Sequence, residues 1–81
     1  MEQRVKELLE STWEGSHVVT ERLHGGRISG SVIWSGFEGK DDVERQQILR
    51  RLLASQLGAD IQDIGILLTY TPTEIEIMTA A

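Results

Sequence analysis

The sequence contains no cysteine. This absence excludes disulfide bonds, thiolate metal ligands and cysteine nucleophiles, and it fits a reducing compartment. No apolar run approaches the roughly 18 residues that a membrane-spanning helix needs. The N-terminal segment MEQRVKELLE is charged and lacks the apolar centre of a signal peptide. We therefore expect a soluble cytoplasmic protein that does not enter a membrane.

Basic residues are few: eight Lys and Arg stand against thirteen Asp and Glu, for a net charge of −5. This balance works against nucleic-acid binding through bulk electrostatics, although it leaves room for a local basic patch. Catalytic motifs of the G-x-S-x-G, P-loop or H-E-x-x-H type do not occur in the sequence, and the carboxylates are scattered among polar positions. A chain of 81 residues forms one domain, 1–81, and we do not expect it to be an enzyme.

The clearest periodic segment is 40–58. Its apolar residues recur at helical spacing and predict one buried stripe: Val43, Ile48, Leu49, Leu52, Leu53 and Leu57. Arg45, Arg50 and other polar residues lie mostly off this stripe. Asp41 can cap the first turn, and Gly58 suits the position just after the helix. Segment 2–13 predicts a second amphipathic helix, whose final residue Trp13 closes one end of a small core.

Two segments, 18–23 and 27–34, have the alternation and the β-branched residues typical of strands. The paired glycines between them predict a tight turn and an antiparallel hairpin. Gly30 within a strand indicates a bulge or the close approach of another backbone. Segment 64–70 is almost continuously apolar, which predicts a third strand that is buried on both faces or central in the sheet.

The residues after Pro72 leave two alternatives open. Glu and Ile alternate there as in an edge strand, yet Thr73 could cap a short helix. The element order predicts an α+β fold: a three-stranded mixed sheet, made of the hairpin and a third strand, with two main helices packed on one face. The third strand should return parallel to one member of the hairpin.

This order and several local strings resemble the BolA family, from about Val5 to Glu74. The strings that carry the resemblance are VIWSGFEGK at 32–40, VERQQIL at 43–49 and TYTPTE at 69–74. Arg45 matches the first arginine of the family's helix start, and the last string matches the exit from its final strand. The resemblance implies a BolA-like, class II KH-like fold and a binding or regulatory module. The partner that it implies is a monothiol glutaredoxin or another iron–sulfur trafficking protein.

The sequence departs from the family at the positions that matter for an iron–sulfur cluster. Gln46 stands where the family has histidine on the helix, and Gln62 or Asp63 stands where it has a histidine implicated in ligating a cluster shared with the glutaredoxin. Amide and carboxylate oxygens are poor replacements for imidazole at such a cluster. We therefore expect no cofactor of the chain's own, and His24 on the hairpin turn is the surviving metal-ligand candidate.

Two other functions compete with this one. Gly36, Phe37 and Gly39 form the G-x-x-G spacing of KH domains, which lets backbone approach a phosphate chain, and Lys40 and Arg45 would add positive charge. That pattern predicts a KH-like nucleic-acid-binding domain, and the resemblance to BolA proteins, some of which are associated with transcriptional regulation, implies a transcriptional regulatory domain.

The other alternative is an interaction subunit that self-associates as a weak homodimer through an exposed strand edge. The segments proposed for that edge are 20–23 and 75–78.

Overall fold

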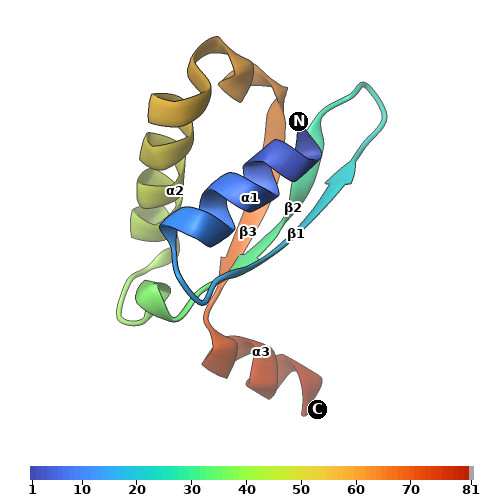
Figure 1. The fold of residues 1–81 in the computed structure, drawn as a ribbon. Coiled ribbons are helices and arrows are strands. Elements are labelled where there is room, and N and C mark those ends of the chain that lie inside the picture. The colour runs from blue at the N-terminus through green and yellow to red at the C-terminus, as the bar shows by residue number, and fades with distance from the viewer. Residues whose placement is uncertain (81) are drawn as a thin grey trace.

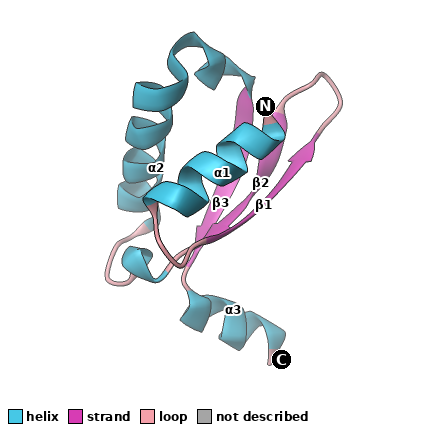
Figure 2. Ribbon diagram, in the orientation of Figure 1, coloured by secondary structure: helices cyan, strands magenta, loops and turns pink. Residues whose placement is uncertain are grey.

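The computed structural model describes residues 1–80 and has the α+β architecture that the sequence predicts (Figures 1 and 2). No helix in this part of the chain combines the length and the apolar character that crossing a membrane requires. The elements, in chain order, are α1 (Glu2–Thr12), β1 (His17–Arg22), β2 (Ile28–Ile33), a 3-10 turn (Ser35–Phe37), α2 (Asp42–Leu57), a second 3-10 segment (Gly58–Asp63), β3 (Ile64–Tyr70) and α3 (Pro72–Thr79).

The sheet has the order β1-β2-β3, so the hairpin strand β2 is central. β1 pairs antiparallel with β2, with Val18 opposite Val32, and β3 returns parallel to β2, with Tyr70 opposite Ile33. The prediction of a central or doubly buried third strand is wrong. β3 lies at an edge, and its Ile66 and Leu68 side chains are 70% and 50% exposed. The two main helices pack on only one face, which leaves the other face of β3 open.

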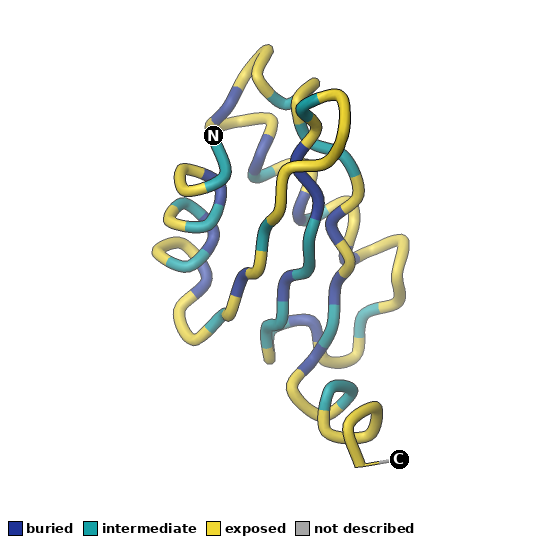
Figure 3. The backbone as a smooth tube through the Cα atoms, turned by 90° about the vertical axis from the view of Figure 1, so that its right-hand side faces the viewer, coloured by how far each residue is buried: buried dark blue, intermediate teal, exposed yellow. Residues whose placement is uncertain are grey.

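The core lies between that face and the helices α1 and α2, as the sequence predicts (Figure 3). Val5 and Leu9 of α1 are completely buried, and α2 contributes three leucines. The remaining members come from the strands, the first loop and the 3-10 turn after β2. The cluster comprises Val5, Leu9, Trp13, Val18, Val32, Phe37, Leu49, Leu53, Leu57 and Leu67.

Helix α2 begins and ends where expected. Asp41 accepts a hydrogen bond from the Glu44 N–H at 2.9 Å, and Gly58 follows with a φ of 57° that favours glycine. Two side chains depart from the predicted stripe. Val43 is 65% exposed, whereas Arg45 is buried. The charge of Arg45 is compensated by contacts that periodicity does not reveal.

An aromatic cluster closes one end of the core. The rings of Trp13 and Trp34 are parallel, with centroids 4.6 Å apart, and Phe37 meets both edge-on. A Cβ on Gly36 would lie about 2.5 Å from the Trp34 ring, so glycine is required there for this packing. The glycines of the loop therefore shape the turn into α2.

Gly30 lies where two strands leave no room for a side chain. A Cβ at this position would lie 1.9 Å from the Val19 carbonyl oxygen, which confirms the predicted close approach. The register between β2 and β3 also shifts between Ile28 and Gly30. Within the shift, the Ser29 hydroxyl accepts a hydrogen bond from the Ile66 N–H at 3.3 Å. The bulge is therefore supported by a side chain of the central strand.

The C-terminal segment forms the helix α3, which resolves the open alternatives as far as Thr79; the last residue of the segment, Ala81, lies outside the described residues. It projects beyond the end of the sheet (Figures 1 and 3). The cap is Thr71 rather than Thr73, because Pro72 occupies the first helical position. The proposal of a pairing edge at 75–78 is therefore wrong, since these residues are helical and direct their backbone groups along α3.

Candidate functional site

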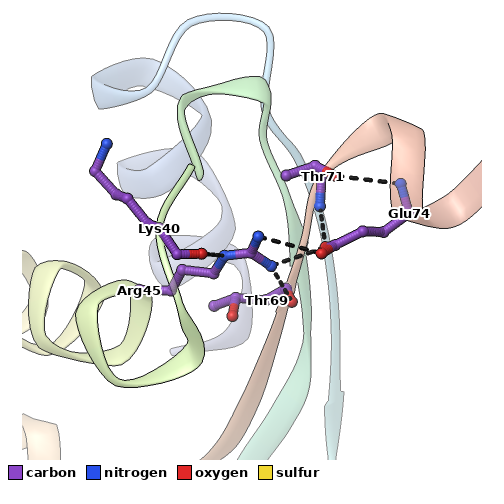
Figure 4. Close-up of polar contacts among 5 residues, drawn as sticks. All are labelled: Lys40, Arg45, Thr69, Thr71 and Glu74. Carbon is purple, nitrogen blue, oxygen red and sulfur yellow. Dashed lines mark hydrogen bonds and ion pairs between the residues drawn. The ribbon is translucent and has the colours of Figure 1, made fainter. Parts of the chain in front are cut away.

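The most connected polar group in the described chain is the Arg45 guanidinium, where α2, β3 and α3 meet (Figure 4). Its Nη1 and Nη2 donate to the two carboxylate oxygens of Glu74 at 2.8 and 3.2 Å. Nε donates to the Lys40 carbonyl at 2.9 Å, and Nη1 is also 3.5 Å from the Thr69 carbonyl. The guanidinium also lies 5.8 Å from the centre of the Phe37 ring. The planar fork of arginine suits this bidentate geometry, which a lysine ammonium could not reproduce.

Glu74 takes part in a second set of bonds that begins α3. Its carboxylate accepts the Thr71 N–H at 2.8 Å, while the Thr71 hydroxyl accepts the Glu74 N–H at 3.1 Å. The two residues form a complete capping box. One carboxylate thus caps the helix and holds it to Arg45.

The two charges stabilise each other's ionised forms. The Arg45 guanidinium, followed by the Thr71 N–H, lowers the pKa of Glu74 below its ordinary value of 4.5. The hydrogen bond to Glu74 raises the pKa of Arg45, against the opposing effect of burial. The side chains are 8% and 43% exposed, so the guanidinium is enclosed while the carboxylate still reaches water.

The residues proposed for nucleic-acid binding are not presented together. Phe37 is completely buried and Arg45 is engaged by Glu74, so neither is free for a base or a phosphate. Lys40 Nζ donates to the Gly36 carbonyl at 3.2 Å, within the loop itself. Gly39 is exposed with open space around its Cα. The loop geometry therefore favours a structural role for these five residues.

The proposed metal residue His24 is exposed on the hairpin turn. Ile28 pairs with Ile64, so this turn and the start of β3, with Gln62 and Asp63, lie at the same end of the sheet (Figure 1). Among residues 1–80, no three His, Cys, Asp or Glu side chains come together as a metal site. One imidazole beside amide and carboxylate oxygens is a donor set that does not suit an iron–sulfur cluster.

On both edges of the sheet, side chains form hydrogen bonds with backbone groups of the edge strands. On β3, Gln46 Nε2 donates to the Leu67 carbonyl at 2.8 Å, beside the contact of Arg45 with Thr69. On β1, the Val18 N–H donates to a Glu10 carboxylate oxygen at 3.0 Å. Such contacts oppose the addition of a further strand. Gln46, which stands at the family's histidine position, thus has a structural role at the β3 edge.

Sequence reasoning missed Glu74 as the partner of Arg45 and missed Gln46 as a cap of the strand edge. The first had a local signal, because Thr71 and Glu74 have the spacing of a capping box before an apolar pair. The second had none, since a glutamine on a helix does not reveal which strand lies beside it.

Comparison with solved structures finds BolA proteins that match this fold over most of the chain. A BolA protein homologue from Coxiella burnetii matches with a TM-score of 0.69 and 29% identity, covering 94% of this chain and 96% of that one. BolA1 from Arabidopsis thaliana matches with a TM-score of 0.70 and 23% identity, covering 90% and 93%. The BolA domain of SufE1 from the same plant gives 0.73 and 20%, covering 89% and 92%.

Comparisons of the sequence, by contrast, find no match. No protein-family model matches the chain, and no curated protein is significantly similar to it. The structural matches extend over about nine-tenths of the chain.

Proposed function

We propose that this chain, which has the BolA-like fold, is a non-enzymatic protein-binding module whose partner is a monothiol glutaredoxin or a related iron–sulfur trafficking protein. The observation that carries the proposal is the likeness to BolA structures over nearly the entire chain. One of the matched structures is the BolA domain of a protein named SufE1, so this fold also occurs as a domain of another protein. That setting suits a docking module.

The chemistry at the end of the sheet supports binding without a shared cluster. A cluster ligand from this chain would have to be His24, because Gln62 and Asp63 offer only oxygen and amide groups at the neighbouring position. We propose that the partner keeps its own cluster ligands and that this chain contributes protein surface.

The experiment mixes the protein with a monothiol glutaredoxin, first cluster-free and then cluster-loaded. Co-elution is followed by gel filtration, and the cluster is followed by its visible circular dichroism. We expect co-elution in both cases with an unchanged cluster spectrum. The variants Gln62→His and Asp63→His each place an imidazole at the end of the sheet where His24 lies, and we expect one of them to alter the spectrum.

The absence of co-elution with either form of the glutaredoxin would overturn the choice of partner. A spectral change with the wild-type protein that disappears in His24→Ala would instead show that this chain supplies a ligand. His17→Ala is the matched control, because His17 is also exposed but begins β1 at the opposite end of that strand.

A further inference from the structure

An apolar surface follows β3 and continues onto α3. Ile66, Leu68 and Tyr70 lie on the open face of the sheet and line one shallow depression. Tyr70 also lines a second depression with Ile77 and Met78 of α3. We call these five residues the β3–α3 strip. Side chains two apart on a strand point to the same face, which makes the strip continuous along β3.

The strip is unusually exposed for its composition. Ile66 and Ile77 are each 70% exposed, Met78 is 57% exposed and Leu68 is 50% exposed. Most of the large hydrophobic side chains that this structure exposes therefore lie here. A contiguous apolar patch on a small domain marks a surface that another molecule covers.

The shape and charge of the strip indicate what covers it. A symmetric pairing of two copies through this patch would bring the acidic residues beside it, Asp42 and Glu76, toward those of the second copy, and like charges oppose such a contact. A single amphipathic helix laid along the strip is the recognition mode that fits a narrow apolar surface.

The charges beside the strip indicate the sign of the charge that the bound helix carries. Asp42 lines the depression between α2 and the end of β3, together with Leu68 and Tyr70. Glu76 is exposed on α3, and the last turn of α3 contains no basic residue to offset its dipole. Arg45 lies close by, but Glu74 neutralises it. The α3 end of the strip therefore attracts positive charge.

From these observations, we propose that the β3–α3 strip binds a helix of the partner protein that carries an apolar stripe flanked by lysine or arginine. This inference rests on the proposed function and specifies the surface that it uses. It names the type of segment recognised rather than the identity of the partner. The peptide experiment below therefore succeeds or fails independently of whether the glutaredoxin binds.

The probe is a synthetic helix of about 18 residues, made of leucine at helical spacing and lysine elsewhere. Two control peptides accompany it: a scrambled sequence of identical composition, and a version with glutamate in place of lysine. Binding is measured by isothermal titration, and the site is mapped by amide chemical shifts of the labelled protein. We expect a dissociation constant of about 10–100 µM for the leucine–lysine helix, with the largest shifts on the strip, and at least about tenfold weaker binding of both controls.

Two matched variants locate the site. Leu68 belongs to the strip and is 50% exposed, whereas Val43 of α2 is 65% exposed and lines neither of the two depressions that the strip lines. We expect Leu68→Lys to weaken binding at least about tenfold and Val43→Lys to change it less than about threefold. Both substitutions replace exposed side chains, so circular dichroism should report an intact fold.

Several results would overturn the inference. They are equal binding of the scrambled peptide, shifts centred away from β3 and α3, and equal losses in Leu68→Lys and Val43→Lys. Sedimentation of the protein alone provides the last test: a dimer that Leu68→Lys dissociates would mean that a second copy, not a partner helix, occupies the strip.

Discussion

Arg45 and Glu74, 29 residues apart in the sequence, form a two-pronged ion pair whose shorter contact is 2.8 Å. The pair is the principal polar contact between α2 and α3, and it sets the position from which Ile77 and Met78 face outward. The stability of this junction and the geometry of the β3–α3 strip therefore depend on the same two side chains.

Removing the guanidinium should destabilise the protein. Arg45→Ala loses the bonds to Glu74, Lys40 and Thr69, and we expect the free energy of unfolding to fall by about 1–3 kcal/mol in urea titrations. Arg45→Lys keeps the charge but not the fork, so it should recover only part of the loss. Wild-type stability in Arg45→Ala would contradict this structural role. Arg50→Ala, on an exposed part of α2, is the control.

The junction should also respond to acid. The pKa of Glu74 is lower in the folded state than in the unfolded chain, because Arg45 and the Thr71 N–H favour the carboxylate. Its contribution to stability is therefore complete above the unfolded value and is lost as the pH falls through the folded pKa. Glu74→Gln should be less stable than wild type near pH 7 and should approach wild type as the pH falls through the folded pKa of Glu74. A difference between the two proteins that is constant with pH would contradict this linkage.

Gly30 should tolerate no side chain. Gly30→Ala places a Cβ against the Val19 carbonyl, so β1 and β2 must separate, and we expect a loss of at least about 3 kcal/mol or failure to fold. Gly25→Ala is the comparison, because this turn has open space and only a positive φ of 87°. It should cost about 1–2 kcal/mol. Denaturation of both variants gives the test, and similar losses would show that Gly30 is not constrained by contact.

The parallel rings of Trp13 and Trp34 should give a coupled signal in the tryptophan bands of the circular dichroism spectrum. Trp13→Phe should remove the coupling while retaining most of the packing, whereas Trp13→Ala should cost about 3–5 kcal/mol. A spectrum of Trp13→Phe with the wild-type shape would mean that the two rings are not stacked in solution.

Much of the fold could be predicted from the sequence because its signals are local. The cap at Asp41, the glycine after α2 and the hairpin turn each depend on a few neighbouring residues. The close approach at Gly30 could also be predicted, since glycine within a strand often marks a bulge or a second backbone packed against it.

The remaining features depend on long-range contacts. The apolar character of β3 predicts burial, but the sequence does not reveal that α1 and α2 pack on the same face and leave Ile66 and Leu68 uncovered. The charge of Arg45 predicts a place on the polar face of its helix, because nothing near it in the sequence indicates Glu74. The β3–α3 strip could not be predicted for the same reason: it is formed by what the helices do not cover.

The most direct test of the account is an amide chemical-shift titration of the labelled protein with an unlabelled, cluster-free monothiol glutaredoxin. The account predicts saturable shifts that include Leu68, Tyr70 and Ile77 and that weaken in Leu68→Lys. An unchanged spectrum with the glutaredoxin at about 1 mM, a concentration that would detect even weak binding, would contradict it.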